Sequence, residues 1–233
     1  MLKKTVLTFA FLLFFTSFYG FNSRLAGPAF DDETLSRAGD AAMHAPLLGE
    51  GEYAISAYDE IIRTISEREG NDWRLMSAIA YHESRFTADI VSRRGARGLM
   101  QIMPSVAGQF DVPVSSISDP EVNVWLANKL MSEILSTLRL SPEVSEQDRT
   151  ALVLAAYNSG IGHVSDARRL ARLHGENPDS WEVVARYLAL KSEPEYYEHE
   201  AVRCGRFTGS RQTLAYVRDV MGRYDKYRRM TVR

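Results

Sequence analysis

One carboxylate in the sequence lies on the apolar side of a predicted helix. Glu83 follows Ile79 by four residues and Ala80 by three, so these side chains share one helical face. A carboxyl group among apolar side chains has a raised pKa, because burial disfavours its charged form, and it can keep a proton near neutral pH. Glu83 is therefore a candidate general acid. The structural alternative is that Glu83 pairs with a neighbour such as Arg85 or caps the next segment.

A polar loop follows this helix and leads into a string with the composition of a cleft wall, GLMQIMP from Gly98 to Pro104. Gly98 permits a positive φ or a close backbone approach, and Gln101 offers both a donor and an acceptor. Met100 and Met103 supply adaptable apolar surface, and the proline can begin a helix. By itself, the string is more typical of a turn whose methionines belong to the core.

Tyr157 and Asn158 form a second polar pair, at the end of a predicted helix that Gly160 terminates. Both side chains can reach a neighbouring cleft from that position. The alternative needs no ligand: Asn158 and Gly160 end the helix, and Tyr157 packs in the interior. The pair therefore indicates a functional site only in combination with the other motifs.

The elements that must position these residues are predicted to be helices in series. Apolar side chains recur at three- and four-residue spacing, and Asp72 and Asp119-Pro120 supply helix starts. The predicted helices are 53–69, 72–84, 119–138, 147–158, 164–174, 180–190 and 211–229. Alternating β-type runs are scarce and no internal repeat is present. We expect a single all-α domain.

Composition excludes several other classes of protein. The 233 residues are 45% hydrophobic and 25% charged, with 28 basic and 30 acidic side chains, which is ordinary for a globular protein and disfavours a nucleic-acid partner. Cys204 is the one cysteine, so no internal disulfide can form. The five histidines lack paired ligand spacing, and we expect neither a metal nor a cofactor. Arg168, Arg169 and Arg172 are expected on a solvated helix face.

The start of the chain predicts export. Lys3 and Lys4 precede an apolar run over 5–21, the pattern of a secretory signal, although no clean small-residue cleavage site follows. We therefore expect residues 1–24 to be a signal peptide or a retained N-terminal anchor, 25–51 a linker, and 52–233 the catalytic domain. The protein is expected in the periplasm or cell envelope, with membrane association, if any, through its N-terminus.

Taken together, three strings resemble the motifs of lytic murein transglycosylases in order and spacing. They are ESRF from Glu83, the segment 91–104, and AYNSGIG at 156–162, and the likeness extends over about 72–224, to a closing Tyr-Val pair at 216–217. The resemblance implies an all-α, lysozyme-like fold of the goose-type class. It makes Glu83 the catalytic acid and gives Ser92, Gln101, Tyr157 and Asn158 roles in binding the substrate or positioning Glu83.

The resemblance also implies a reaction. The substrate would be the β-1,4 link between N-acetylmuramic acid and N-acetylglucosamine in peptidoglycan strands, cut by a monomer without water to give 1,6-anhydromuramyl products. Glu83 would act first as acid and then as base. Two alternatives remain: a hydrolytic muramidase that uses Asp89 as second carboxylate, and a wall-binding protein that does no chemistry.

Overall fold

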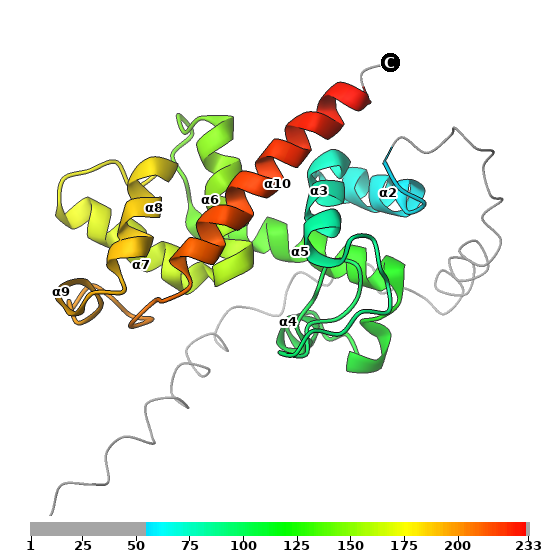
Figure 1. Cartoon of the computed structure of the whole chain (residues 1–233), viewed down its shortest axis with the longest axis horizontal. Helices are drawn as coiled ribbons and strands as arrows, with labels where there is room; N and C mark the ends of the chain where they lie inside the picture. The colour runs from blue at the N-terminus through cyan, green and yellow to red at the C-terminus, as the bar shows by residue number, and fades with distance from the viewer. Residues whose placement is uncertain (1–54, 232–233) are drawn as a thin grey trace, which may run out of the picture. The chain divides into compact units, whose positions relative to one another are not determined.

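The structure, a computed structural model, describes residues 55–231, and this part of the chain is helical (Figure 1). Its elements are α2 (Asp59–Glu69), α3 (Trp73–Ser84), α4 (Pro104–Gln109), the 3₁₀ turn η1 (Val114–Ser116), α5 (Pro120–Leu138), α6 (Glu146–Ser159), α7 (Ile161–Leu173), α8 (Trp181–Leu190), α9 (Pro194–Tyr197) and α10 (Ser210–Met230). Within 55–231, strand-like pairing is limited to isolated bridges of Arg97 with Val91 and with Ile102. The predicted all-α fold is confirmed.

Local chemistry accounts for the helix starts. The Asp72 carboxylate accepts a hydrogen bond from the N–H of Arg74 at 2.8 Å, and Asp119 accepts from Glu121 and Val122 at 3.0 Å each. These bonds satisfy N–H groups that the first helical turn leaves without partners. The predicted starts of α3 and α5 are therefore confirmed, together with their cap residues.

Several parts of the helical pattern differ from the prediction. The first helix begins at Asp59 instead of residue 53, because the Asp59 carboxylate accepts from the N–H groups of Ile55 and Ser56, at 2.9 and 2.8 Å, and holds a turn there. The short helix α9 occupies a stretch predicted as a break, since Pro194 at its first position starts a helix as readily as it ends one. The predicted export segment and linker lie outside the described residues.

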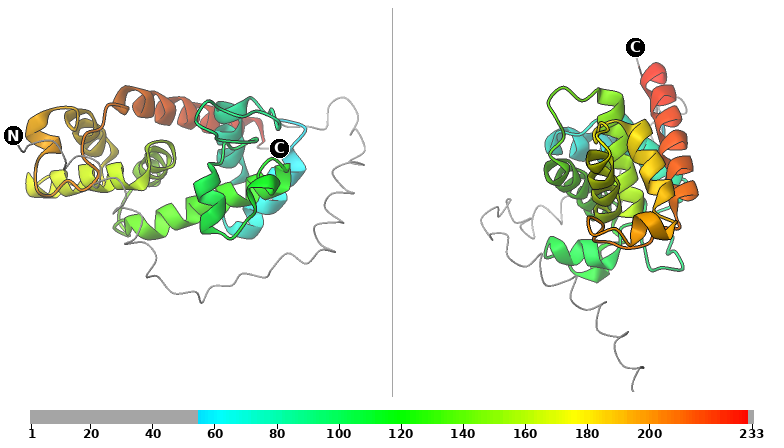
Figure 2. Two further views of the ribbon diagram at one scale, coloured as in Figure 1. Left: turned by 90° about the horizontal axis from the view of Figure 1, so that it is seen from below. Right: turned by 90° about the vertical axis from the view of Figure 1, so that its left-hand side faces the viewer.

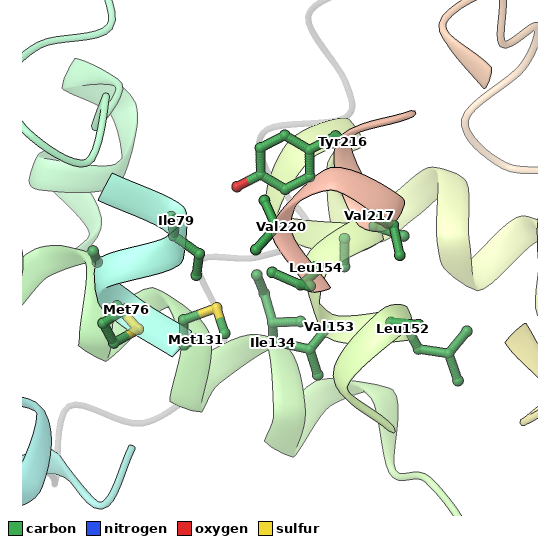
Figure 3. Close-up of a cluster of buried hydrophobic side chains, with 14 of the residues drawn as sticks. Met76, Ile79, Met131, Ile134, Leu152, Val153, Leu154, Tyr216, Val217 and Val220 are labelled. Atoms are coloured by element: carbon green, nitrogen blue, oxygen red, sulfur yellow. The ribbon is translucent and has the colours of Figure 1, made fainter. Parts of the chain in front are cut away.

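The packing of α10 links the site to the rest of the domain. This helix contacts α3, α6 and α8, while α2 packs on α3 and α5 (Figures 1 and 2). Between these helices lies a core of buried side chains, including Met76, Ile79, Ile134, Leu154 and Val220 (Figure 3). The end of α3, where Glu83 is located, is thereby fixed against α10.

One expected surface residue is buried. Arg168 is 4% exposed; its guanidinium donates to the carbonyls of Pro178, at 3.1 Å, and Leu138, and forms an ion pair with Asp179. The prediction of a solvated face was wrong at this position because the segment after α7 and the end of α5 supply acceptors, whereas Arg172 is exposed as expected. Among the helices that the structure describes, none combines the length and apolarity that a membrane span requires.

Candidate active site

Glu83 is half-buried in the last turn of α3. Burial raises its pKa to about 7, and among the described residues the hydroxyl of Tyr216 opposes this rise by stabilising the charged form. Arg85 is engaged elsewhere: its guanidinium lies 4.3 Å from the centre of the Tyr81 ring and donates to the hydroxyl of that tyrosine. Glu83 is thus a carboxyl that can hold a proton near neutral pH, and pairing with Arg85 does not explain it.

Two phenols share the surroundings of Glu83. Tyr216 of α10 is 2% exposed, and its hydroxyl points toward α3 (Figure 3) and has no hydrogen-bond partner among the described residues. Tyr157 of α6 donates from its hydroxyl to the carbonyl of Met100 at 2.8 Å. Burial raises the pKa of both phenols well above the usual value, and the nearby charge of Glu83 adds to the rise. Both tyrosines therefore remain protonated hydrogen-bond donors.

The chain leaves α3 through two residues in the left-handed region, Arg85 with φ 55° and Phe86 with φ 61°. Such angles are uncommon for residues with side chains and reverse the chain direction within a few residues. The loop that follows folds back, and Arg97 pairs with both Val91 and Ile102. This turn brings the GLMQIMP string into the neighbourhood of the helix that carries Glu83.

A buried amide from α5 fixes that string. Asn123 accepts from the N–H of Met100 at 2.7 Å and donates to the carbonyl of Arg97 at 2.9 Å. Gly98 has φ 78°, and a Cβ atom at this position would lie 2.5 Å from Nδ2 of Asn123. Both predicted reasons for a glycine, a positive φ and a close approach, are confirmed. Met100 is fully buried and belongs to the core, whereas Met103 is 37% exposed.

The polar side chains predicted in this loop hydrogen-bond within it. Gln101 donates from its amide to the carbonyls of Gly98 at 3.0 Å and Ile90 at 3.2 Å. The Ser92 hydroxyl accepts from the N–H of Ala96 at 3.0 Å and closes a turn. These bonds order the loop, and contact of Ser92 and Gln101 with a substrate stays a prediction.

Tyr157 and Asn158, the predicted pair at the end of α6, contact different parts of the domain. Tyr157 reaches the loop, as described above, while Asn158 accepts from the hydroxyl of Thr213 at 2.9 Å. Thr213 is buried in the first turn of α10, so this bond ties α6 to the helix that carries Tyr216. Sequence reasoning missed Thr213 and the influence of Tyr216 on the pKa of Glu83; the only signal was the Tyr-Val pair, which gave no partner.

The second carboxylate considered from the sequence does not influence the pKa of Glu83. Asp89 is exposed on the turn after α3 and is not among the groups that shift the pKa of Glu83. Across residues 55–231, no three His, Cys, Asp or Glu side chains are grouped so as to hold a metal ion. The described groups around Glu83 therefore offer one protonated carboxyl group, two phenol hydroxyls and a side-chain amide.

Comparison with known proteins places this site in a family. The model of the Transglycosylase SLT domain matches residues 60–179. The chain belongs to this transglycosylase domain family. The resemblance recognised in the sequence motifs is confirmed, and the matched segment contains Glu83, the GLMQIMP string and Tyr157.

Curated relatives and a solved structure agree with this membership. The chain is 36% identical over 154 residues to membrane-bound lytic murein transglycosylase F of Alteromonas mediterranea, covering 66% of this chain and 32% of that protein. The homologue from Alcanivorax borkumensis is 34% identical over 168 residues, covering 72% and 34%. The chain thus spans about a third of these relatives. The 70 kDa soluble lytic transglycosylase of Escherichia coli has the same fold, with TM-score 0.50 and 22% identity over 76% of this chain and 25% of that one.

Proposed function

We propose that the protein cleaves the β-1,4 bond between N-acetylmuramic acid and N-acetylglucosamine in peptidoglycan, without consuming water, and leaves 1,6-anhydromuramyl ends. The observation that carries the proposal is the protonatable Glu83, whose pKa of about 7 results from burial opposed only by Tyr216. The names of the relatives, lytic murein transglycosylases, support the same substrate and reaction type. A hydrolase of the usual kind needs two carboxylates at the scissile bond.

In the first step Glu83 donates its proton to the glycosidic oxygen as the bond to the muramyl C1 breaks, and the N-acetylglucosamine side leaves as an alcohol. The N-acetyl oxygen of the muramyl residue stabilises the positive charge that develops at C1. Glu83 is now a carboxylate, and the hydroxyl of Tyr216 stabilises that charge, in agreement with its lowering of the Glu83 pKa.

In the second step the Glu83 carboxylate takes the proton from the muramyl O6 hydroxyl, and this oxygen bonds to C1. The product is the 1,6-anhydro sugar, and Glu83 is protonated again for the next cycle. One carboxyl group serves as acid and then as base, which is why no second carboxylate is required.

The remaining predicted residues take supporting roles in this proposal. Ser92 and Gln101 order the loop beside the saccharide. Tyr157 lines the site, and Asn158 holds α10 in place through its hydrogen bond with Thr213. We further propose that the domain 52–233 works as a monomer on glycan strands in the cell envelope, after export directed by residues 1–24. The word "membrane-bound" in the names of the relatives supports an envelope location.

Mass spectrometry of muropeptides after digestion of purified peptidoglycan tests the proposal. We expect products lighter by one water than those of a muramidase, and a loss of about 10²- to 10⁴-fold in rate for Glu83→Gln. Asp89→Asn is the control carboxylate substitution and should retain the activity. Hydrated reducing ends, together with an inactive Asp89→Asn protein, would establish the muramidase alternative. Binding to intact, uncut wall would establish the wall-binding one.

A further inference from the structure

A neutral side chain outside the predicted site connects its parts. Asn123 of α5 is wholly buried, and its amide makes three hydrogen bonds: it accepts from the N–H of Met100 at 2.7 Å and donates to the carbonyls of Arg97 at 2.9 Å and Ile117 at 2.8 Å. Bonds on both its oxygen and its nitrogen fix the orientation of the amide plane. The segment from Arg97 to Met100 is therefore held against α5.

The held segment leads directly to Tyr157. The N–H of Met100 is bound by Asn123, and the carbonyl of the same residue accepts the hydroxyl proton of Tyr157 at 2.8 Å. The charge of Glu83 in turn acts on Tyr157. One continuous series of hydrogen bonds thus runs from Asn123 through Met100 to Tyr157, a phenol that lies within the electrostatic influence of Glu83.

We infer that Asn123 is a positioning residue for the reaction proposed above, which fixes the Met100 backbone so that Tyr157 stays beside Glu83. The inference rests on the proposed function for its catalytic meaning. The close approach of Gly98, where a Cβ atom would meet Nδ2 of Asn123 at 2.5 Å, indicates that the loop is built around this amide. An amide also suits the place because it carries no charge that would alter the proton affinity of Glu83.

The same helix contains a matched residue that lacks this connection. Asn128 is also wholly buried; it accepts from the side chain of Asn71 at 2.9 Å and donates to the carbonyl of Val124 at 2.9 Å. Its partners lie between α2 and α3 and within α5, away from the Met100 segment. Alanine at either position removes the same atoms from the same helix, so the pair separates a general loss of packing from a loss of positioning.

A double-mutant cycle tests the inference. The kcat for cleavage of soluble peptidoglycan strands is measured, below the melting temperature of each variant, for Asn123→Ala, Tyr157→Phe and the double variant. We expect a loss of up to about 100-fold for Asn123→Ala. The double variant should be no slower than the slower single variant, because both substitutions disrupt the same positioning of the Tyr157 hydroxyl. Asn128→Ala should keep kcat near that of the unmodified protein, and its effect should add to that of Tyr157→Phe.

A second readout does not depend on activity. The ¹³C NMR signal of the Tyr157 ring carbon that bears the hydroxyl, assigned by its absence in Tyr157→Phe, should move in Asn123→Ala and stay in place in Asn128→Ala. If Asn123→Ala does not fold, Asn123→Asp takes its place in both measurements. Additive effects in the cycle, or an unmoved Tyr157 signal, would overturn the inference. If the unmodified protein cuts no peptidoglycan, the proposed function fails, and the NMR comparison alone decides the positioning role.

Discussion

Two carboxylates of this domain, one half-buried and one wholly buried, have opposite electrostatic surroundings. Glu83, at the end of α3, has a pKa raised to about 7 by burial, with only the Tyr216 hydroxyl opposing the rise. Asp166, in α7, is wholly buried, and burial would raise its pKa as well. Its hydrogen bonds to the Lys191 ammonium, at 2.6 Å, and to the N–H groups of Arg203 and Cys204, at 2.9 Å each, nevertheless hold that pKa below the usual value.

The neighbours of Asp166 explain why it stays charged. Lys191 is fully buried and lies 3.0 Å from Nδ1 of His163. Burial, helped by the Lys191 charge, lowers the pKa of His163 to about 4, so the ring is neutral at physiological pH and can accept a hydrogen bond from the ammonium group. Arg169 adds a second ion pair to Asp166. The cluster joins α7, the end of α8 and the segment around residue 203.

The comparison shows that burial alone does not decide the charge of a carboxyl group; the polar groups around it do. Asp166 is surrounded by cations and donors, so it is ionised and serves the fold. Among the described residues a phenol alone lowers the pKa of Glu83, so this carboxyl keeps a proton that it can give away. A buried carboxyl left nearly unpaired is costly for stability and therefore points to a functional role.

The largest expected effect is a loss of stability on substitution of Asp166. Asp166→Asn removes one partner of a buried ion pair and leaves Lys191 charged without compensation, so the free energy of unfolding should fall by about 3–5 kcal/mol. Urea unfolding at pH 7 measures this change. The wild-type contribution of Asp166 is present above its unfolded pKa, near 4, and is lost as pH falls through its lower folded pKa. A fall of less than about 1 kcal/mol would contradict the structural role of the pair.

The second effect is a gain of stability on substitution of Glu83. Because its folded pKa is above the unfolded one, its contribution to stability is full below pH 4.5 and is lost as pH rises through about 7. Glu83→Gln, which cannot ionise, should therefore be more stable than the wild type by up to about 3 kcal/mol at pH 9. The difference should shrink toward zero at pH 4, as measured by unfolding of both proteins across that range. A gap independent of pH would mean that Glu83 is not the titrating group.

These differences mark the limit of what the sequence predicts. Local patterns placed Glu83 on the apolar side of a capped helix, because helix periodicity and Asp72 act within a few residues. The partners that set charge states come from distant segments: Tyr216 lies on the last helix, and Lys191 reaches Asp166 from the end of α8. Arg168 looked like a surface residue for the same reason, since periodicity does not show that the carbonyls of Pro178 and of Leu138, at the end of α5, lie beside it.

The smallest expected effect tests the one partner that Glu83 has. Tyr216→Phe removes a hydroxyl that stabilises the charged carboxylate, so the pKa of Glu83 should rise further. Because the reaction starts from protonated Glu83, the alkaline limb of kcat/KM should move to higher pH, by about one unit for a hydrogen bond to a charged group. The shift is read from pH profiles of the wild type and the variant on the same glycan strands.

The same helix provides the control for this shift. Tyr224 is also buried, and its hydroxyl donates to the Asp72 carboxylate at 2.9 Å, at the opposite end of α3 from Glu83. Tyr224→Phe should therefore lower stability by about 1.5–3 kcal/mol, as expected for a hydrogen bond to a charged group, without moving the alkaline limb. Equal shifts in the two variants would mean that Tyr216 acts through the packing of α10, and not through its hydroxyl on Glu83. A shift confined to Tyr216→Phe would show that this hydroxyl lowers the proton affinity that burial gives Glu83, as the contrast with Asp166 requires.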